Sequence, residues 1–158
     1  MDESAALLAE IERALAAAPT REAALAAVCR LVATRRPGYD WVGFYCVDPE
    51  RPRELVLGPF VGEPTEHTRI PFGRGICGQV AERAETMVVE DVTAEANHLA
   101  CSLAVRSEIV VPILVRGRFV AQLDIDSHQP ARFGPADRAL CEAICARLAP
   151  LFAGEAPQ

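Results

Sequence analysis

The chain has 158 residues, half of them hydrophobic, which is enough to bury the core of one domain and argues against disorder. The net charge is −6, and all sixteen basic residues are arginine, with no basic patch that alternates with aromatic residues; this disfavours nucleic-acid binding. Charged residues interrupt the apolar N-terminus, which lacks the basic start of a secretory signal, and no segment is long and apolar enough to span a bilayer. We therefore expect a cytoplasmic protein with no membrane association.

Six cysteines occur in the chain, and none has the CxxC spacing typical of zinc sites: Cys29, Cys46, Cys77, Cys101, Cys141 and Cys145. In a reducing cytoplasm the expected state of these residues is the free thiol. A disulfide formed there would be transient and catalytic rather than structural.

The first half of the chain predicts two helices followed by an antiparallel hairpin. Apolar residues at helical spacing indicate a helix over 4–18, and Thr20 is a suitable N-cap for a second helix that ends near Ala33. The aromatic and β-branched segment 39–47 predicts a strand, 48–53 a turn, and 54–60 the returning strand. On the first strand, alternation places Trp41, Gly43 and Tyr45 on one face.

The second half predicts short strands, one short helix and a C-terminal helix. Strands are expected at 68–70, 86–92, 107–115 and 118–126, a helix at 76–84, and a long loop at 93–106. A last helix opens at Gly134 and runs to about Phe152, and 153–158 is expected to be a frayed tail. This order predicts a single α+β domain over 1–158: a mainly antiparallel sheet with the N- and C-terminal helices on one face.

Two of the cysteines lie where chemistry is plausible. Cys77, in IPFGRGICG, begins the short helix, whose N-terminus and the nearby Arg74 would lower the pKa of the thiol. A small buried apolar role is the alternative. Cys101, in NHLAC, follows His98 in the irregular loop, and function is common on such loops, so we favour Cys101 as the nucleophile.

Three acidic residues interrupt strands that are otherwise strongly apolar: Glu108 in SEIVVP, and Asp124 and Asp126 in LDIDS. Acidic residues are poor strand formers. Neighbouring carboxylates raise each other's pKa, so one of them is a candidate proton donor near neutral pH while another holds an ammonium group. A structural network at a strand end is the alternative explanation.

The register of the last hairpin tests whether these acids share a site. A plain two-residue loop at Arg116–Gly117 would turn Glu108 away from both aspartates. A three-residue loop, or a bulge near Pro112, would place Glu108 opposite Asp126. We predict one of the latter two arrangements.

The remaining polar and aromatic residues are less specific. Trp41 and Tyr45 share a face and could wall a pocket, although the sequence alone favours core packing as their role. Cys29, Cys46, Cys141 and Cys145 are expected to fill the core. His67 and His128 are ambiguous, and a zinc site from His67, Cys77, His98 and Cys101 would match no standard spacing.

Six motifs in order resemble the free methionine-(R)-sulfoxide reductases, which are GAF-domain enzymes: YDWVGFY, LVLGPF, IPFGRGICG, HLAC, SEIVVP and LDIDS, within about residues 20–152. The resemblance implies a GAF fold and reduction of free L-methionine (R)-S-oxide. It implies Cys101 as the nucleophile with Cys77 as its partner, and Trp41, Tyr45, Glu108, Asp124 and Asp126 as substrate-binding residues.

The implied cycle needs no metal or organic cofactor. Cys101 becomes a sulfenic acid, Cys77 condenses with it to an intramolecular disulfide, and a thioredoxin-type dithiol recycles the enzyme. Many members carry a third cysteine ten residues before the GRGICG cysteine, where this chain has His67. That difference leaves open whether Cys77 resolves the intermediate and which cysteine attacks first.

A rival interpretation is a GAF module that binds a ligand or senses redox state without turnover. GAF domains often form homodimers, and the N-terminal helices offer a surface for one. Release of methionine in a single turnover would separate the enzyme from the sensor.

Overall fold

The computed structural model describes residues 2–95 and 104–155. A six-stranded antiparallel sheet runs through it in the order β3-β2-β1-β6-β5-β4. The strands are β1 (Trp41–Asp48), β2 (Arg51–Val61), β3 (Arg69–Pro71), β4 (Met87–Val89), β5 (Ser107–Val115) and β6 (Arg118–Ser127).

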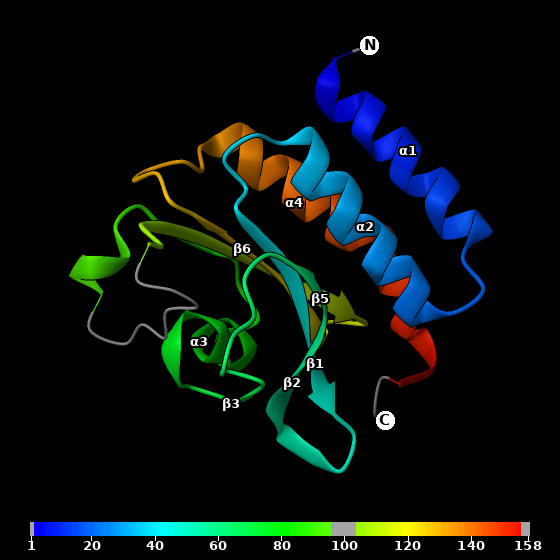
Figure 1. Ribbon diagram of the computed structural model, residues 1–158. Coiled ribbons are helices and arrows are strands. Elements are labelled where there is room, and N and C mark those ends of the chain that lie inside the picture. Colours follow the sequence, from blue (N-terminus) through cyan, green and yellow to red (C-terminus); the bar gives the residue numbers. More distant parts are fainter. Residues whose placement is uncertain (1, 96–103, 156–158) are drawn as a thin grey trace.

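Three helices lie on one side of this sheet and a fourth lies on the other (Figure 1). The first side carries α2 (Arg21–Arg35) and α4 (Pro135–Leu148), with α1 (Glu3–Ala17) packed outside them. The opposite side carries α3 (Gly75–Arg83), and the described residues also include two 3₁₀ helices, η1 (Val92–Ala94) and η2 (Ala149–Glu155). The predicted α+β class, with the N- and C-terminal helices on one face, is confirmed.

The two N-terminal helices begin at side-chain caps. The Asp2 carboxylate accepts a hydrogen bond of 2.7 Å from the Ala5 amide, and the Thr20 hydroxyl accepts one of 3.1 Å from Ala23. These bonds satisfy amides that the first helical turn leaves without partners. The predicted cap at Thr20 is confirmed.

Three predicted boundaries were wrong because local side-chain bonds shape the chain. The turn expected at 48–53 is only two residues long, since the Asp48 carboxylate accepts from the Glu50 amide and β2 begins at Arg51. The strand expected at 86–92 stops at Val89, and Asp91 caps η1 through Thr93. The expected frayed tail is helical as far as residue 155, and the Ala153 carbonyl accepts from Arg116.

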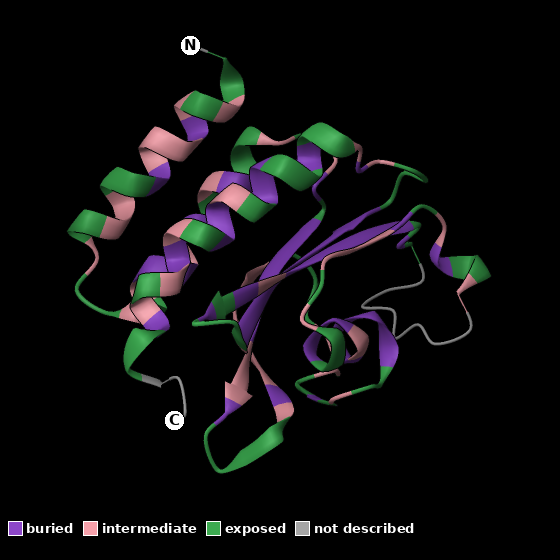
Figure 2. Ribbon diagram, turned by 180° about the vertical axis from the view of Figure 1, so that it is seen from behind, coloured by how far each residue is buried: buried purple, intermediate pink, exposed green. Residues whose placement is uncertain are grey.

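Alternation along β1 divides the interior into two apolar clusters. Val42 and Phe44 face α2 and α4 and belong to the larger core. Trp41 and Tyr45 face the opposite way, as predicted, into a smaller core beneath α3. Both sides of the central strands are therefore buried, and the sheet is purple along most of its length in Figure 2.

The β5–β6 hairpin combines a two-residue turn with a bulge. Arg116 and Gly117 both have positive φ, the geometry that suits tight hairpins, and Val115 pairs with Arg118. Beyond the turn the register shifts, so that Ile113 pairs with Ala121 and Val120 becomes the extra residue. The shift brings Glu108 directly opposite Asp126, which confirms that the acids share a face.

No helix in residues 2–95 or 104–155 is both long and apolar enough to cross a membrane.

Gly43 explains why a glycine interrupts the aromatic side of β1. A Cβ built there would lie 2.5 Å from the Trp41 ring and 2.7 Å from the Phe60 Cβ. We expect Gly43→Ala to lower the free energy of unfolding by about 2 kcal/mol, the usual size of an overpacking penalty, in a urea titration.

Gly154→Ala is the matched control, because a Cβ at Gly154 meets nothing within 4 Å. Equal stability of the Gly43→Ala and Gly154→Ala proteins would contradict this account of the packing.

Candidate functional site

Three carboxyl groups lie together on the α3 side of the sheet. Glu108 on β5 pairs directly with Asp126 on β6, and Asp124 lies two residues earlier on the same face of β6. All three side chains are buried, with exposed fractions of 1–3% for the whole residues. Central strands covered by α3 thus hold acids where apolar residues would ordinarily lie.

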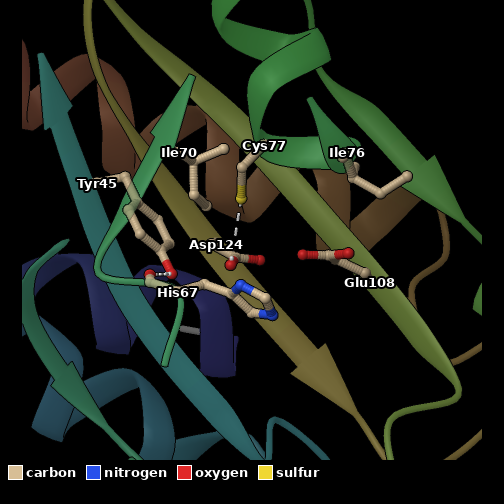
Figure 3. Close-up of a pocket in the computed structure, with 8 residues that line it drawn as sticks. Tyr45, His67, Ile70, Ile76, Cys77, Glu108 and Asp124 are labelled. Carbon is tan, nitrogen blue, oxygen red and sulfur yellow. Dashed lines mark hydrogen bonds between the residues drawn. The ribbon is translucent and has the colours of Figure 1, made fainter. Parts of the chain in front are cut away.

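Cys77 is directed at this group from the first turn of α3 (Figure 3). Its thiol donates a hydrogen bond to Oδ2 of Asp124 at 3.4 Å. Close packing fixes the turn: the Gly73 amide donates to the Gly78 carbonyl, and a Cβ at Gly78 would lie 2.6 Å from the Pro71 carbonyl oxygen. The glycines of the IPFGRGICG motif therefore hold the thiol over the acids.

The structure overturns the expectation that the helix terminus lowers the pKa of Cys77. Burial raises that pKa well above its ordinary value of 9.0, and the charges of Asp124, Glu108 and Asp126 raise it further. The Arg74 side chain is exposed and does not offset them. Cys77 is therefore a protonated thiol at neutral pH in this form of the protein.

The carboxyl group of Glu108 has a strongly shifted pKa. Burial raises its pKa well above 4.5, the charge of Asp126 raises it further, and a hydrogen-bonding interaction with Asp124 lowers it. The net direction is upward, so folding favours the protonated form of Glu108. A carboxylic acid of this kind can donate a hydrogen bond or a proton.

A small cavity lies between the thiol and the acids. Its lining comes from four strands, from α3 and from the loop before β3: Tyr45, His67, Ile70, Gly75, Ile76, Cys77, Glu108 and Asp124. Its volume is about 10 Å³, room for roughly one water molecule. Free methionine sulfoxide is several times larger, so a ligand of that size requires the wall to move.

Two aromatic residues hold one wall of the cavity by its main chain. The Tyr45 hydroxyl donates to the His67 carbonyl at 2.8 Å, and the Trp41 indole donates to the Glu63 carbonyl at 2.9 Å. Trp41 also stacks on Phe60, with ring centroids 5.4 Å apart. Segment 62–68 is therefore tied to β1 above the site.

The predicted site residues are largely brought together. Tyr45, Cys77, Glu108 and Asp124 line one cavity, and Asp126 adjoins it through Glu108. Trp41 supports the wall instead of lining the cavity. Cys101 lies outside the described residues.

Two residues of the suggested zinc site, His98 and Cys101, lie outside the described ranges. His67, which the sequence left ambiguous, lines the cavity. Ile70 and Ile76 were missed as wall residues, and only their place in the IPFGRGICG region marked them. Cys29, Cys141 and Cys145 are buried in the larger core as expected, with Cys46 half-buried beside it.

Comparison with known proteins shows to which family this chain belongs. The GAF domain model matches residues 20–150 of the chain. The chain belongs to the GAF-domain family. Among GAF proteins it is close to the free methionine-R-sulfoxide reductases, with 37–40% identity over most of its length.

Three relatives show the range of that similarity. Free methionine-R-sulfoxide reductase of Escherichia coli is 37% identical over 131 residues, which are 83% of this chain and 77% of the relative. The crystal structure of the Neisseria meningitidis reductase in complex with its substrate is 40% identical, with a TM-score of 0.88 over 99% of this chain and 95% of that one. Protein YtsP of Bacillus subtilis is 48% identical over 101 residues, 64% of this chain and only 61% of its own length.

The raised pKa of Glu108 predicts how its removal changes stability with pH. As pH rises above about 4.5, Glu108 ionises in the unfolded chain but stays protonated in the folded GAF domain, so the wild-type protein loses stability up to the folded-state pKa. The Glu108→Gln protein does not lose stability in this way as pH rises, because its side chain has no proton to release. We expect its melting temperature, relative to wild type, to rise steadily between pH 5 and pH 8.

Glu85→Gln is the control, because Glu85 is exposed. Its melting temperature relative to wild type should not change with pH. A constant difference for Glu108→Gln over the same pH range would show that Glu108 is ionised in the folded protein.

Proposed function

We propose that this protein reduces free methionine (R)-sulfoxide to methionine. The observation that carries the proposal is the set of buried acids, Glu108, Asp124 and Asp126, which face a buried thiol on Cys77. A protonated carboxyl beside ionisable ones suits a substrate with a sulfoxide oxygen to protonate and an ammonium group to bind. Similarity to reductases of that substrate supports the same reaction.

In the proposed complex Glu108 donates a hydrogen bond to the sulfoxide oxygen. Asp126 and Asp124 bind the free ammonium group as carboxylates. Ile70 and Ile76 give an apolar wall to the side chain of the substrate. The cavity widens to admit the substrate when segment 62–68 moves. Trp41 and Tyr45 each hold this segment by a hydrogen bond to its main chain.

Cys101 is the proposed nucleophile, and the state of Cys77 supports that choice. A thiol that burial and three acids keep protonated is a poor attacking group. The Cys101 thiolate attacks the sulfoxide sulfur, and Glu108 supplies a proton to the oxygen as the bond between sulfur and oxygen breaks. The oxygen passes to the Cys101 sulfur as a hydroxyl group, the bond between Cys101 and the substrate sulfur breaks, and methionine leaves, so that Cys101 is left as a sulfenic acid.

Cys77 is the proposed resolving thiol. Its hydrogen bond to Asp124 provides a carboxylate that accepts the thiol proton when Cys77 attacks the sulfenic acid. That step forms a disulfide between Cys77 and Cys101 and releases water. A thioredoxin-type dithiol then reduces the disulfide and restores both thiols.

Substitution of each of the two cysteines should block the reaction at a different step. Cys101→Ser should abolish methionine release even in a single turnover. Cys77→Ser should release about one equivalent of methionine per protein and then turn over with thioredoxin at least about tenfold more slowly, because the sulfenic acid lacks its partner.

Cys46→Ser, which changes a half-buried thiol on the other face of the sheet, should behave as wild type. Wild-type turnover by Cys101→Ser would sink the assignment of the nucleophile. Binding or oxidation without methionine release in the wild-type protein would indicate the sensing module instead.

Recognition of the ammonium predicts selectivity for the free amino acid. N-acetylmethionine (R)-sulfoxide lacks the positive charge, so binding it would leave buried carboxylates without their partner. We expect kcat/KM to fall by on the order of 10⁴-fold in a thioredoxin-coupled assay. Comparable kcat/KM values for methionine (R)-sulfoxide and its N-acetyl derivative would show that the acids do not bind the ammonium group.

A further inference from the structure

The cavity between Cys77 and the acids has the chemistry of a metal site as well as of a substrate site. One ligand atom each from Cys77, Glu108 and Asp124 lies within 4.8 Å of the other two, and all three residues are buried. A thiol with two carboxyl groups is a mixed sulfur and oxygen donor set, which suits borderline-soft divalent cations more than magnesium or calcium.

Distances in the site are close to those that such an ion imposes. Bond lengths near 2.3 Å to sulfur and 2.0–2.2 Å to oxygen, with tetrahedral angles, place two ligand atoms about 3.5 Å apart. The Cys77 Sγ and Asp124 Oδ2 atoms are 3.4 Å apart. A Glu108 carboxyl oxygen lies within 4.8 Å of the thiol sulfur and of an Asp124 carboxyl oxygen.

Space for the ion is already present. These three residues contribute to the lining of the cavity of about 10 Å³, which has room for about one small sphere. His67 lines the same cavity and its imidazole ring is turned toward it (Figure 3). In this form of the protein the cavity has room for a single ion.

Charge gives the reason that an ion would bind. Two carboxyl groups and a thiol are packed against one another, with the Cys77 thiol 3.4 Å from the Asp124 carboxyl oxygen. A divalent cation compensates the negative charge of such ligands, because it binds each of them in its deprotonated form. Cys77 would bind as a thiolate, and the displaced protons would pass to solvent.

We propose that the reduced protein binds one thiophilic divalent cation, such as Zn²⁺, through Cys77, Glu108 and Asp124. The ion fills the cavity, holds Cys77 as a metal thiolate and excludes methionine sulfoxide. Metal availability would therefore control whether this thiol can take part in redox chemistry. The inference concerns the proposed catalytic pocket but does not depend on turnover.

The test is a titration of the reduced, metal-free protein in a non-thiol reductant. Zn²⁺ binding is followed by calorimetry, and Co²⁺ serves as a spectroscopic probe because a cobalt–thiolate bond gives a charge-transfer absorption. We expect one ion per chain, with that absorption in both wild type and Cys101→Ser. Cys77→Ser should lose the absorption.

Carboxylate ligation is tested with variants of nearly unchanged shape, Glu108→Gln and Asp124→Asn. Each should weaken Zn²⁺ binding by more than the roughly 10–100-fold that loss of an outer contact costs. Cys46→Ser is the matched control and should bind as wild type. Circular dichroism of each variant confirms that loss of binding is not loss of fold.

Retention of the cobalt–thiolate absorption in Cys77→Ser, or its loss in Cys101→Ser, would overturn the proposed ligand set. Absence of binding with Zn²⁺ in excess over wild-type protein would overturn the site itself. No methionine sulfoxide is present in the titration. A titration without metal binding would therefore not contradict the proposed reductase activity. A turnover assay without methionine release would not contradict the metal site.

Discussion

The decisive constraint in this protein is the burial of acids and a thiol against one another beneath α3. Desolvation and mutual repulsion raise the pKa values of Glu108 and Cys77 well above their ordinary values and favour the protonated form of each. Burial of such groups stabilises the fold less than apolar side chains in the same places would. The acids and the thiol are arranged so that a proton can be transferred, because a group that can give up a proton lies beside one that can accept it.

The rest of the architecture serves to hold that arrangement in place. The bulge at Val120 sets which face of β5 carries Glu108, and the tight turn at Arg116–Gly117 lets the two strands run close enough to pair. Gly78 lets α3 approach the loop that precedes it, so that Cys77 reaches Asp124. On the other side of the sheet, α2 and α4 bury a conventional apolar core, which supplies most of the hydrophobic stabilisation.

Much of this could be predicted from the sequence because the signals were local. Alternation placed Trp41 and Tyr45 on one side of β1, and Thr20 marked the start of α2. The register argument limited the position of Glu108 to two outcomes, and the bulge decided between them. The protonation state of Cys77 was missed because it depends on acids 31–49 residues further along the chain, which only the folded sheet brings near.

The bond between Tyr45 and the main chain of residue 67 has a consequence for how this site can evolve. Tyr45 anchors a carbonyl oxygen, which every amino acid possesses, so the wall keeps its place whichever side chain occurs at that position. A thiol and an imidazole can therefore replace one another above the same acids with little change in the backbone. Variation at this one position would change the side chain that faces Cys77 and Glu108 while the backbone around the cavity stays in place.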